Sequence, residues 1–323
     1  MKTHLTRHRV TLVNMAPKLL CLDGRNRQDR VIARRRLGRL RDTLVTQRTL
    51  TRYLKAVGLF HYWCQSSYGR EAVSNEELDQ FASLYLDVLW EEGEPRLLAG
   101  DTLSGLQHVL MAKRILPSAC RLFGAWAKNE LPARAPPMPL LVCLAIAGYA
   151  NSKGRTDYGT MILLGFHCFL RTIELFSAVA QNLWLDAQGT GSILLPITKS
   201  GQRIGAPESV TIDDPSVGKR LLVLKSRLQP GAPLIQGSMH EFRVFFNEAL
   251  EALSLQALGF RPYSLRRGGA THDWLTFADL PRTVMRGRWA NLKTAKIYIN
   301  DGWQQIVNMQ LQEAPLRKFA QLA

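Results

Sequence analysis

The segment Arg261-Pro-Tyr-Ser-Leu-Arg-Arg-Gly-Gly-Ala-Thr-His272 carries the strongest structural signal in this chain. A proline and a serine just before an apolar residue predict the start of a helix, with Ser264 as its N-cap. Arg266 then falls in the first turn, where free backbone N–H groups and a guanidinium together favour a phosphate. Two consecutive glycines disfavour a helix interior, so they predict the close approach of another backbone. Arg267 is expected to face solvent or a backbone phosphate. The alternative for the whole segment is an arginine-rich surface turn.

Nearer the N-terminus, the segment Phe169-Leu-Arg-Thr-Ile-Glu-Leu175 lies in an apolar run that predicts one helix over residues 159–180. Arg171 and Glu174 are three residues apart, so they share a face of that helix. A guanidinium beside apolar side chains needs an anionic partner. That partner is either the Glu174 carboxylate, in a local pair, or an external anion.

Nearer the C-terminus stands Arg286-Gly-Arg-Trp-Ala-Asn-Leu-Lys-Thr-Ala-Lys-Ile-Tyr-Ile299. Asn291 is a suitable N-cap for a helix that follows it. Tyr298 lies roughly 80° from the centre of the apolar stripe, at ~100° per residue, and so on the flank of the helix. The residue is therefore either a tyrosine packed at the edge of the core or a phenol available for chemistry.

The remaining periodicity predicts a mostly helical chain with one small antiparallel sheet. Helical spacing of apolar residues covers residues 43–67, 74–92, 97–111, 117–128, 140–151, 215–228, 238–255, 264–276 and 291 onward. Strand-like runs with turn signals cover residues 182–185, 192–197 and 209–212. The amphipathic tail after Tyr298 packs either on its own domain or on a neighbouring subunit.

A proline-rich stretch at residues 129–139 predicts an extended linker between two domains. Two domains also suit a length of 323 residues, which exceeds the usual size of a single hydrophobic core. The predicted organisation is a basic N-terminal arm at 1–41, a helical domain at 42–128, the linker, and a mixed domain at 140–323.

The charge of the chain points to a polyanionic partner, most simply nucleic acid. The formal net charge is +16, and residues 1–41 alone hold 12 basic and 2 acidic residues. This arm is either a solvated basic tail with a nuclear-targeting role or a segment that follows a phosphate backbone. A hydrophobic content of 46% excludes a fully disordered chain.

Several other classes of protein are also disfavoured by the sequence. The five cysteines include no Cys-x-x-Cys pair, so neither a disulfide framework nor a zinc site is expected. No apolar run reaches the ~18–20 residues that a membrane span needs, and no signal peptide is recognisable. We therefore expect an intracellular protein with no membrane partner, nuclear if its host is eukaryotic.

Taken in order, the motifs resemble the tyrosine recombinase (phage-integrase-like) family. The order is an arginine, a lysine in a predicted hairpin, Tyr-x-x-Arg, Gly-x-Trp, and a tyrosine nine residues after that tryptophan. The resemblance covers most of residues 43–310 and no single motif in it is decisive. It implies a helical core-binding domain at 42–128, a mixed α/β tyrosine-recombinase catalytic domain at 140–323, and an origin in a mobile element.

The resemblance also implies a reaction centre for phosphodiester exchange. Tyr298 would be the nucleophile, because a phenol can hold the cleaved strand as a covalent ester. Arg171 and Arg266 would clamp the scissile phosphate, which lets two guanidiniums act where other enzymes use metal ions. Lys199, in the turn Thr198-Lys-Ser-Gly201, would be the general acid toward the leaving 5′ oxygen. No cofactor or metal is then expected.

Three further residues take roles by the same resemblance. Trp289 would occupy a position that the family fills with His or Trp, and Glu174 would be the carboxylate that orients the arginines. Tyr263 stands where the family usually has His, and a phenol is a poor general base at pH 7. His272 is expected to be a structural or surface histidine rather than a substitute for it.

The implied function is a DNA recombinase or integrase that acts on double-stranded DNA through a 3′-phosphotyrosyl intermediate, assembled as a homo-oligomer, a tetramer on DNA. A catalytically impaired DNA-binding protein derived from such an enzyme is the alternative, and Tyr263 is its main support. A relaxing topoisomerase of type IB uses the same chemistry, but a separate helical domain is more typical of recombinases.

Overall fold

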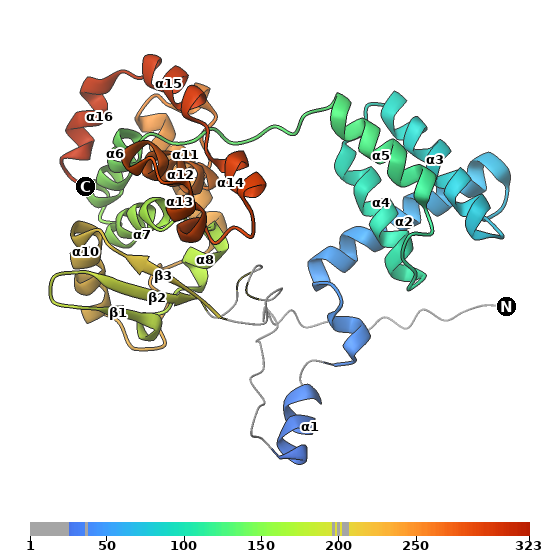
Figure 1. The fold of residues 1–323 in the computed structure, drawn as a ribbon, viewed down its shortest axis with the longest axis horizontal. Helices are drawn as coiled ribbons and strands as arrows, with labels where there is room; N and C mark the ends of the chain where they lie inside the picture. The colour runs from blue at the N-terminus through green and yellow to red at the C-terminus, as the bar shows by residue number, and fades with distance from the viewer. Residues whose placement is uncertain (1–25, 36–37, 196–197, 199–200, 202–206) are drawn as a thin grey trace. The chain divides into compact units, whose positions relative to one another are not determined.

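A computed structural model describes residues 26–35, 38–195, 198, 201 and 207–323 of the chain. The chain forms two compact units, Met1–Ala133 and Arg134–Ala323, so the division falls inside the proline-rich stretch (Figure 1). In the described part of the chain, no helix is both long and apolar enough to cross a membrane.

The first unit is helical throughout its described residues. Its elements are α1 (Arg27–Arg35), the 3-10 helix η1 (Leu40–Thr43), α2 (Gln47–Tyr68), α3 (Asn75–Glu91), α4 (Arg96–Val109) and α5 (Pro117–Asn129). The core lies between α2, α3, α4 and α5, where Phe60 packs edge-on against Tyr85 with ring centroids 5.4 Å apart. Ser74 caps α3 by accepting a hydrogen bond from the Glu77 N–H, as its sequence pattern predicts. The aromatic residues Phe60, Phe81 and Tyr85 are therefore part of the core of this unit.

The second unit combines helices with one three-stranded antiparallel sheet of order β1-β2-β3. Its helices are α6 (Leu140–Ser152), α7 (Thr156–His167), α8 (Thr172–Ser177), α10 (Pro215–Ser226), α11 (Met239–Ala252), α12 (Tyr263–Phe277), α13 (Leu280–Gly287), α14 (Leu292–Tyr298), α15 (Asp301–Met309) and α16 (Glu313–Ala320), with 3-10 turns at Ala180–Asn182 and Gln256–Leu258. The strands are β1 (Leu183–Leu185), β2 (Gly191–Leu195) and β3 (Glu208–Ile212), and Ile193 pairs with both Leu183 and Val210. The predicted fold class is confirmed.

The two consecutive glycines of α12 allow other backbone segments to touch this helix. A Cβ at Gly268 would lie 2.1 Å from the Met138 carbonyl oxygen, and one at Gly269 would lie 1.9 Å from the Phe166 carbonyl oxygen. The predicted close approach is therefore confirmed at both positions. It lets α12 lie against α7 and against the chain that enters α6.

We expect Gly269→Ala to destabilise the second unit by about 1–3 kcal/mol, because the added methyl group meets backbone atoms that cannot turn away. The measurement is thermal or urea unfolding. Gly302→Ala is the matched control, since Gly302 lies in α15 with no atom within 4 Å of its would-be Cβ. The control should be neutral or more stable by up to about 1 kcal/mol. Equal stability of the two variants would contradict the close-contact explanation.

Three local predictions are wrong. The single helix over 159–180 is interrupted between α7 and α8, where Phe169 takes a left-handed φ of 49°. Ser264 is not the N-cap of α12, which begins at Tyr263; its hydroxyl instead accepts from the Arg261 N–H at 3.1 Å. Arg267 does not face solvent, because only 5% of it is exposed.

The C-terminal tail packs on its own unit. Helix α16 lies against α6, where a Cβ at Gly148 would lie 1.7 Å from the Phe319 carbonyl oxygen. The Asn151 side chain donates to the Leu322 carbonyl at 2.6 Å. Val307 of α15 is buried as well, whereas 47% of Trp303 and 45% of Ile306 are exposed, so docking of this tail on a neighbouring subunit stays a prediction.

Candidate active site

The candidate active site gathers parts of the second unit that are far apart in the sequence. It is built from the turn between α7 and α8, the first turn of α12, the turn after α13, and the last residue of α14. The hydrogen bonds below join these four segments. The three motifs quoted from the sequence all contribute to it.

Arg266 is the most deeply buried member, with no exposed side-chain surface. Its guanidinium donates to the Phe169 carbonyl and to the Gly287 carbonyl, the latter at 2.7 Å. Burial, together with the neighbouring positive charges of Arg171 and Arg288, lowers the pKa of Arg266 to about 10. The side chain still carries its positive charge at pH 7.

Tyr298 lies against two of the other predicted site residues. Its ring packs on that of Trp289 with centroids 4.7 Å apart, and the guanidinium carbon of Arg266 is 5.2 Å from each ring centroid. The Tyr263 hydroxyl donates a hydrogen bond to the Tyr298 hydroxyl at 2.6 Å. The residue that replaces the family's usual His is therefore in direct contact with the candidate nucleophile.

The pKa values of the two phenols, Tyr298 and Tyr263, are shifted in opposite directions. Burial alone would raise the pKa of Tyr298, but the hydrogen bond from Tyr263 and the charges of Arg266 and Arg171 outweigh it and lower that pKa. Burial raises the pKa of Tyr263, and its bond to Tyr298 adds to the increase. Tyr263 is thus a neutral hydrogen-bond donor at pH 7 rather than a base, and Tyr298 is the phenol more readily ionised.

Glu174 joins two guanidiniums, and only 1% of it is exposed. Arg171 donates to it twice, from Nη1 to Oε1 at 2.5 Å and from its backbone N–H to Oε2 at 2.8 Å. Arg288 Nη2 donates to Oε2 at 2.7 Å. The local Arg171–Glu174 pair therefore exists, and 24% of the Arg171 side chain remains exposed, within reach of an external anion.

Arg288 is the site residue that the sequence did not reveal. It follows α13 with a left-handed φ of 54°, a conformation that costs a residue with a Cβ about 1–2 kcal/mol. Nothing in its segment distinguishes it from Arg286, two residues earlier. Only the tertiary structure brings it to Glu174.

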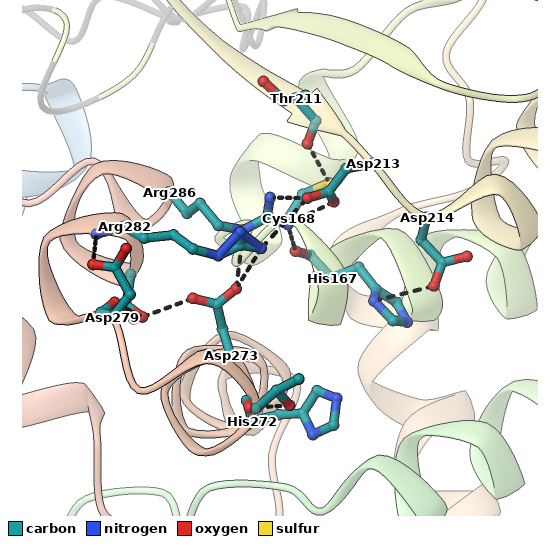
Figure 2. A network of polar contacts seen from close by, with 12 residues as sticks. His167, Cys168, Thr211, Asp213, Asp214, His272, Asp273, Asp279, Arg282 and Arg286 are labelled. Carbon is teal, nitrogen blue, oxygen red and sulfur yellow. Dashed lines mark hydrogen bonds and ion pairs between the residues drawn. The ribbon is translucent and has the colours of Figure 1, made fainter.

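A separate polar network fixes the helix that leads into this turn (Figure 2). Arg286 of α13 donates to the His167 carbonyl at 2.8 Å and pairs with Asp213 at 2.5 Å. It also lies 3.4 Å from a carboxylate oxygen of Asp273 on α12. His272 is in this region, where its ring packs 5.7 Å from that of Phe166, as expected for a structural histidine. The network anchors α13 to α7, α12 and the chain after β3.

Lys199, the predicted general acid, lies outside the described residues, so its place in the site stays a prediction. Over the residues that the structure does describe, no group of three or more His, Cys, Asp or Glu side chains is arranged to hold a metal ion. The groups that the described site offers to a ligand are guanidiniums, phenols and an indole.

No protein-family model and no curated protein sequence matches this chain. Solved structures share its fold. The Tn1549 transposon integrase in complex with transposon right end DNA is 12% identical with a TM-score of 0.57, and the match covers 87% of this chain and 96% of that one. A lambda integrase dimer bound to a COC′ core site is 14% identical with a TM-score of 0.56, covering 85% and 94%. The XerH site-specific recombinase bound to a palindromic difH substrate is 14% identical with a TM-score of 0.56, covering 80% and 78%.

The chain therefore has the fold of the tyrosine recombinases. The resemblance noted from its motifs is confirmed at the level of fold, although identity to these structures is low.

Proposed function

We propose that this protein is a site-specific DNA recombinase or integrase that cleaves and rejoins double-stranded DNA through a 3′-phosphotyrosyl intermediate at Tyr298. The observation that carries the proposal is the placement of the Tyr298 phenol beside the guanidinium of Arg266 and in a hydrogen bond with Tyr263. A phenol with a lowered pKa beside fixed cations suits attack on a phosphodiester.

In the proposed step the Tyr298 oxygen forms a bond to phosphorus while the bond from phosphorus to the 5′ oxygen breaks. The phenol proton of Tyr298 passes to solvent water, and the 5′ oxygen gains a proton, for which Lys199 is the proposed donor. Arg171 and Arg266 stabilise negative charge on the non-bridging oxygens. Rejoining is the reverse, with a 5′ hydroxyl attacking the phosphotyrosine and the phenol leaving, so no external energy source is needed.

Tyr263 has a specific part in this proposal. Because its hydroxyl donates to the Tyr298 oxygen, it cannot at the same time accept the proton that Tyr298 loses. It instead stabilises the phenolate, which is the nucleophile in cleavage and the leaving group in rejoining. The rings of Tyr298 and Trp289 both lie over the Arg266 guanidinium, with their centroids 5.2 Å from its central carbon.

The rest of the chain is proposed to bind DNA. The first unit acts as the core-binding domain, and the basic residues 1–41 provide a sequence-independent, salt-sensitive grip on phosphates. A lambda integrase dimer bound to DNA is among the similar folds and supports a homo-oligomer. We further propose that the protein works as a tetramer on DNA. In a eukaryotic host the protein acts in the nucleus, and its source is a mobile element.

The test is covalent trapping on a suicide substrate, a DNA nicked near the cleavage site so that the released fragment diffuses away. A protein–DNA adduct that survives denaturation, with the protein on a 3′ end, is the expected result, and sequencing the attached strand gives the site. Clear DNA binding without adduct would instead support the non-catalytic alternative, a DNA-binding protein that has kept the fold. Relaxation of supercoiled DNA without strand exchange would support a type IB topoisomerase.

Tyr263→Phe should slow cleavage at pH 7 by about 10-fold or more, since a hydrogen bond to a charged group contributes ~1.5–3 kcal/mol. Losing the donor raises the pKa of Tyr298, so less phenolate is present at pH 7. The rate should recover as the pH rises, and the rising limb of the pH–rate profile should move to higher pH. The measurement is the rate of single-turnover cleavage between pH 6 and 10, a range chosen because the ordinary pKa of a phenol is ~10.

Tyr68→Phe is the matched control, because this tyrosine lies in the first unit and is 41% exposed. Its pH–rate profile should overlay that of the wild type. A Tyr263→Phe profile that is lower at every pH but not displaced would argue against stabilisation of the phenolate.

A further inference from the structure

The segment formed by Gly287, the last residue of α13, and the two residues after it is connected to both predicted phosphate-binding arginines. The Gly287 carbonyl accepts a hydrogen bond from Arg266 Nη2 at 2.7 Å, and the Trp289 ring lies 5.2 Å from the same guanidinium. Between them, Arg288 turns its side chain to Glu174, whose carboxylate holds Arg171. This short segment thus contacts Arg266 directly and is linked to Arg171 through Glu174.

The backbone of Arg288 is held in a conformation that glycine adopts more easily than any other residue. Its φ is 54° and its ψ is 43°, and it ends α13 by donating its N–H to the Met285 carbonyl at 3.0 Å. Helices often end in this way with glycine, which has no Cβ to strain. An arginine in such a position directs attention to what its side chain does there.

The side chain of Arg288 is nearly enclosed, with 7% exposed. Its Nη2 donates to Glu174 Oε2 at 2.7 Å, and its Nε lies 4.0 Å from Glu208 Oε2 at the start of β3. Nε and Nη1 have no hydrogen-bond partner among the described residues. The guanidinium therefore faces two carboxylates rather than solvent, and it is Arg171 that keeps exposed surface.

Arg288 is one of several neighbours that favour the charged form of Glu174. Burial by itself would raise the pKa of Glu174, and Arg288 is the strongest of the neighbours that together lower it below its ordinary value. A charged carboxylate can accept both hydrogen bonds from Arg171, whereas a protonated one loses part of that capacity.

We propose that Arg288 is a positioning residue that fixes Arg171 for the scissile phosphate through the shared Glu174 carboxylate. The inference rests on the proposed function and adds to it a third guanidinium that does not itself touch the DNA. It also explains the left-handed backbone at Arg288, which directs this side chain to Glu174 while the Gly287 carbonyl accepts a hydrogen bond from Arg266.

The test is a double-mutant cycle on single-turnover cleavage of the suicide substrate. Arg288→Met and Glu174→Gln should each slow cleavage by about 10- to 100-fold, the range for one hydrogen bond to a charged group. Because both act on Arg171 by the same route, the double variant should be within about twofold of the slower single variant. Affinity for DNA should stay within about threefold of the wild type, since Arg288 is enclosed.

Arg288→Gly and Arg288→Lys complete the design. The glycine variant takes the left-handed backbone without strain, so it separates loss of the side chain from misfolding, which its melting temperature checks. The lysine variant restores a charge near Glu174 and should recover part of the rate. Arg317→Met is the control, because the exposed Arg317 pairs with Glu313 within α16, and this variant should cleave like the wild type.

The outcomes separate the inference from the proposed function. If the wild type forms the adduct, and Arg288→Met and Arg288→Gly cleave as fast as the wild type, the inference is overturned and the proposed function stands. If the double variant is slower by the product of the two single effects, Arg288 acts independently of Glu174 and the inference is also overturned. If the folded wild type binds DNA and forms no adduct, both are overturned.

Discussion

Tyr298→Phe should bind DNA as the wild type does and form no covalent adduct on the suicide substrate. The substitution removes one oxygen and keeps the ring that packs on Trp289, 4.7 Å away between centroids. Loss of an enzyme's nucleophile typically costs about 10⁴-fold or more, so cleavage should fall below detection. The measurement is a denaturing gel for the adduct beside a gel-shift titration for DNA affinity.

Tyr298→Phe should leave the stability of the fold nearly unchanged. Tyr263 loses its acceptor in the variant, but it is 39% exposed and can donate to water instead, so stability should change by less than about 1 kcal/mol. Tyr62→Phe is the matched control, since Tyr62 lies in the first unit and is 74% exposed. An adduct of normal yield in Tyr298→Phe would assign the nucleophile to another residue.

Arg266→Lys should reduce cleavage by about 10²–10³-fold, the loss typical of one fixed donor to a developing charge. The guanidinium of Arg266 donates to the Phe169 and Gly287 carbonyls and still has N–H groups left for a phosphate. Lysine keeps the positive charge but lacks this planar set of donors. The rate of single-turnover cleavage measures the loss. Arg266→Ala should in addition unfold at a lower temperature, because it leaves two buried carbonyls without their donor at about 1–3 kcal/mol each.

The control for this substitution is Arg317→Lys. Arg317 pairs with Glu313 on the exposed surface of α16, where an ion pair contributes at most about 1 kcal/mol. That variant should match the wild type in both cleavage rate and melting temperature. A rate for Arg266→Lys within threefold of the control would mean that the guanidinium only supports the fold.

Local patterns in the sequence were sufficient for most of the helices, the small sheet and the order of the motifs. The glycine pair predicted a close backbone contact because its cost in a helix must be offset, and Met138 and Phe166 provide that contact. Helix α13 was missed although its signals were present, since Asp279 caps it and Pro281 stands in its first turn. An N-cap aspartate followed by a proline in the first turn is typical of the start of a helix, so α13 was predictable from the sequence.

Other features depend on contacts that no local pattern contains. The break before α8 was not predictable, because the apolar spacing continues through Phe169 and no glycine or proline marks the break. The carbonyl of Phe169 accepts a hydrogen bond from Arg266, which lies 97 residues later in the sequence. The role of Arg288 likewise depends on Glu174, 114 residues earlier. The burial of Arg267 follows from the packing of α12, and not from the charge of its segment.

These long separations bear on when activity first becomes available during synthesis. A ribosome delivers Glu174 well before Arg266, Arg288 and Tyr298, so the cation cluster and the candidate nucleophile reach their partners only after the chain through residue 298 has been made. Loop closure over such distances also makes this part of the fold slow to form. On the proposed function, a chain that stops before Tyr298 therefore has no means to cleave DNA.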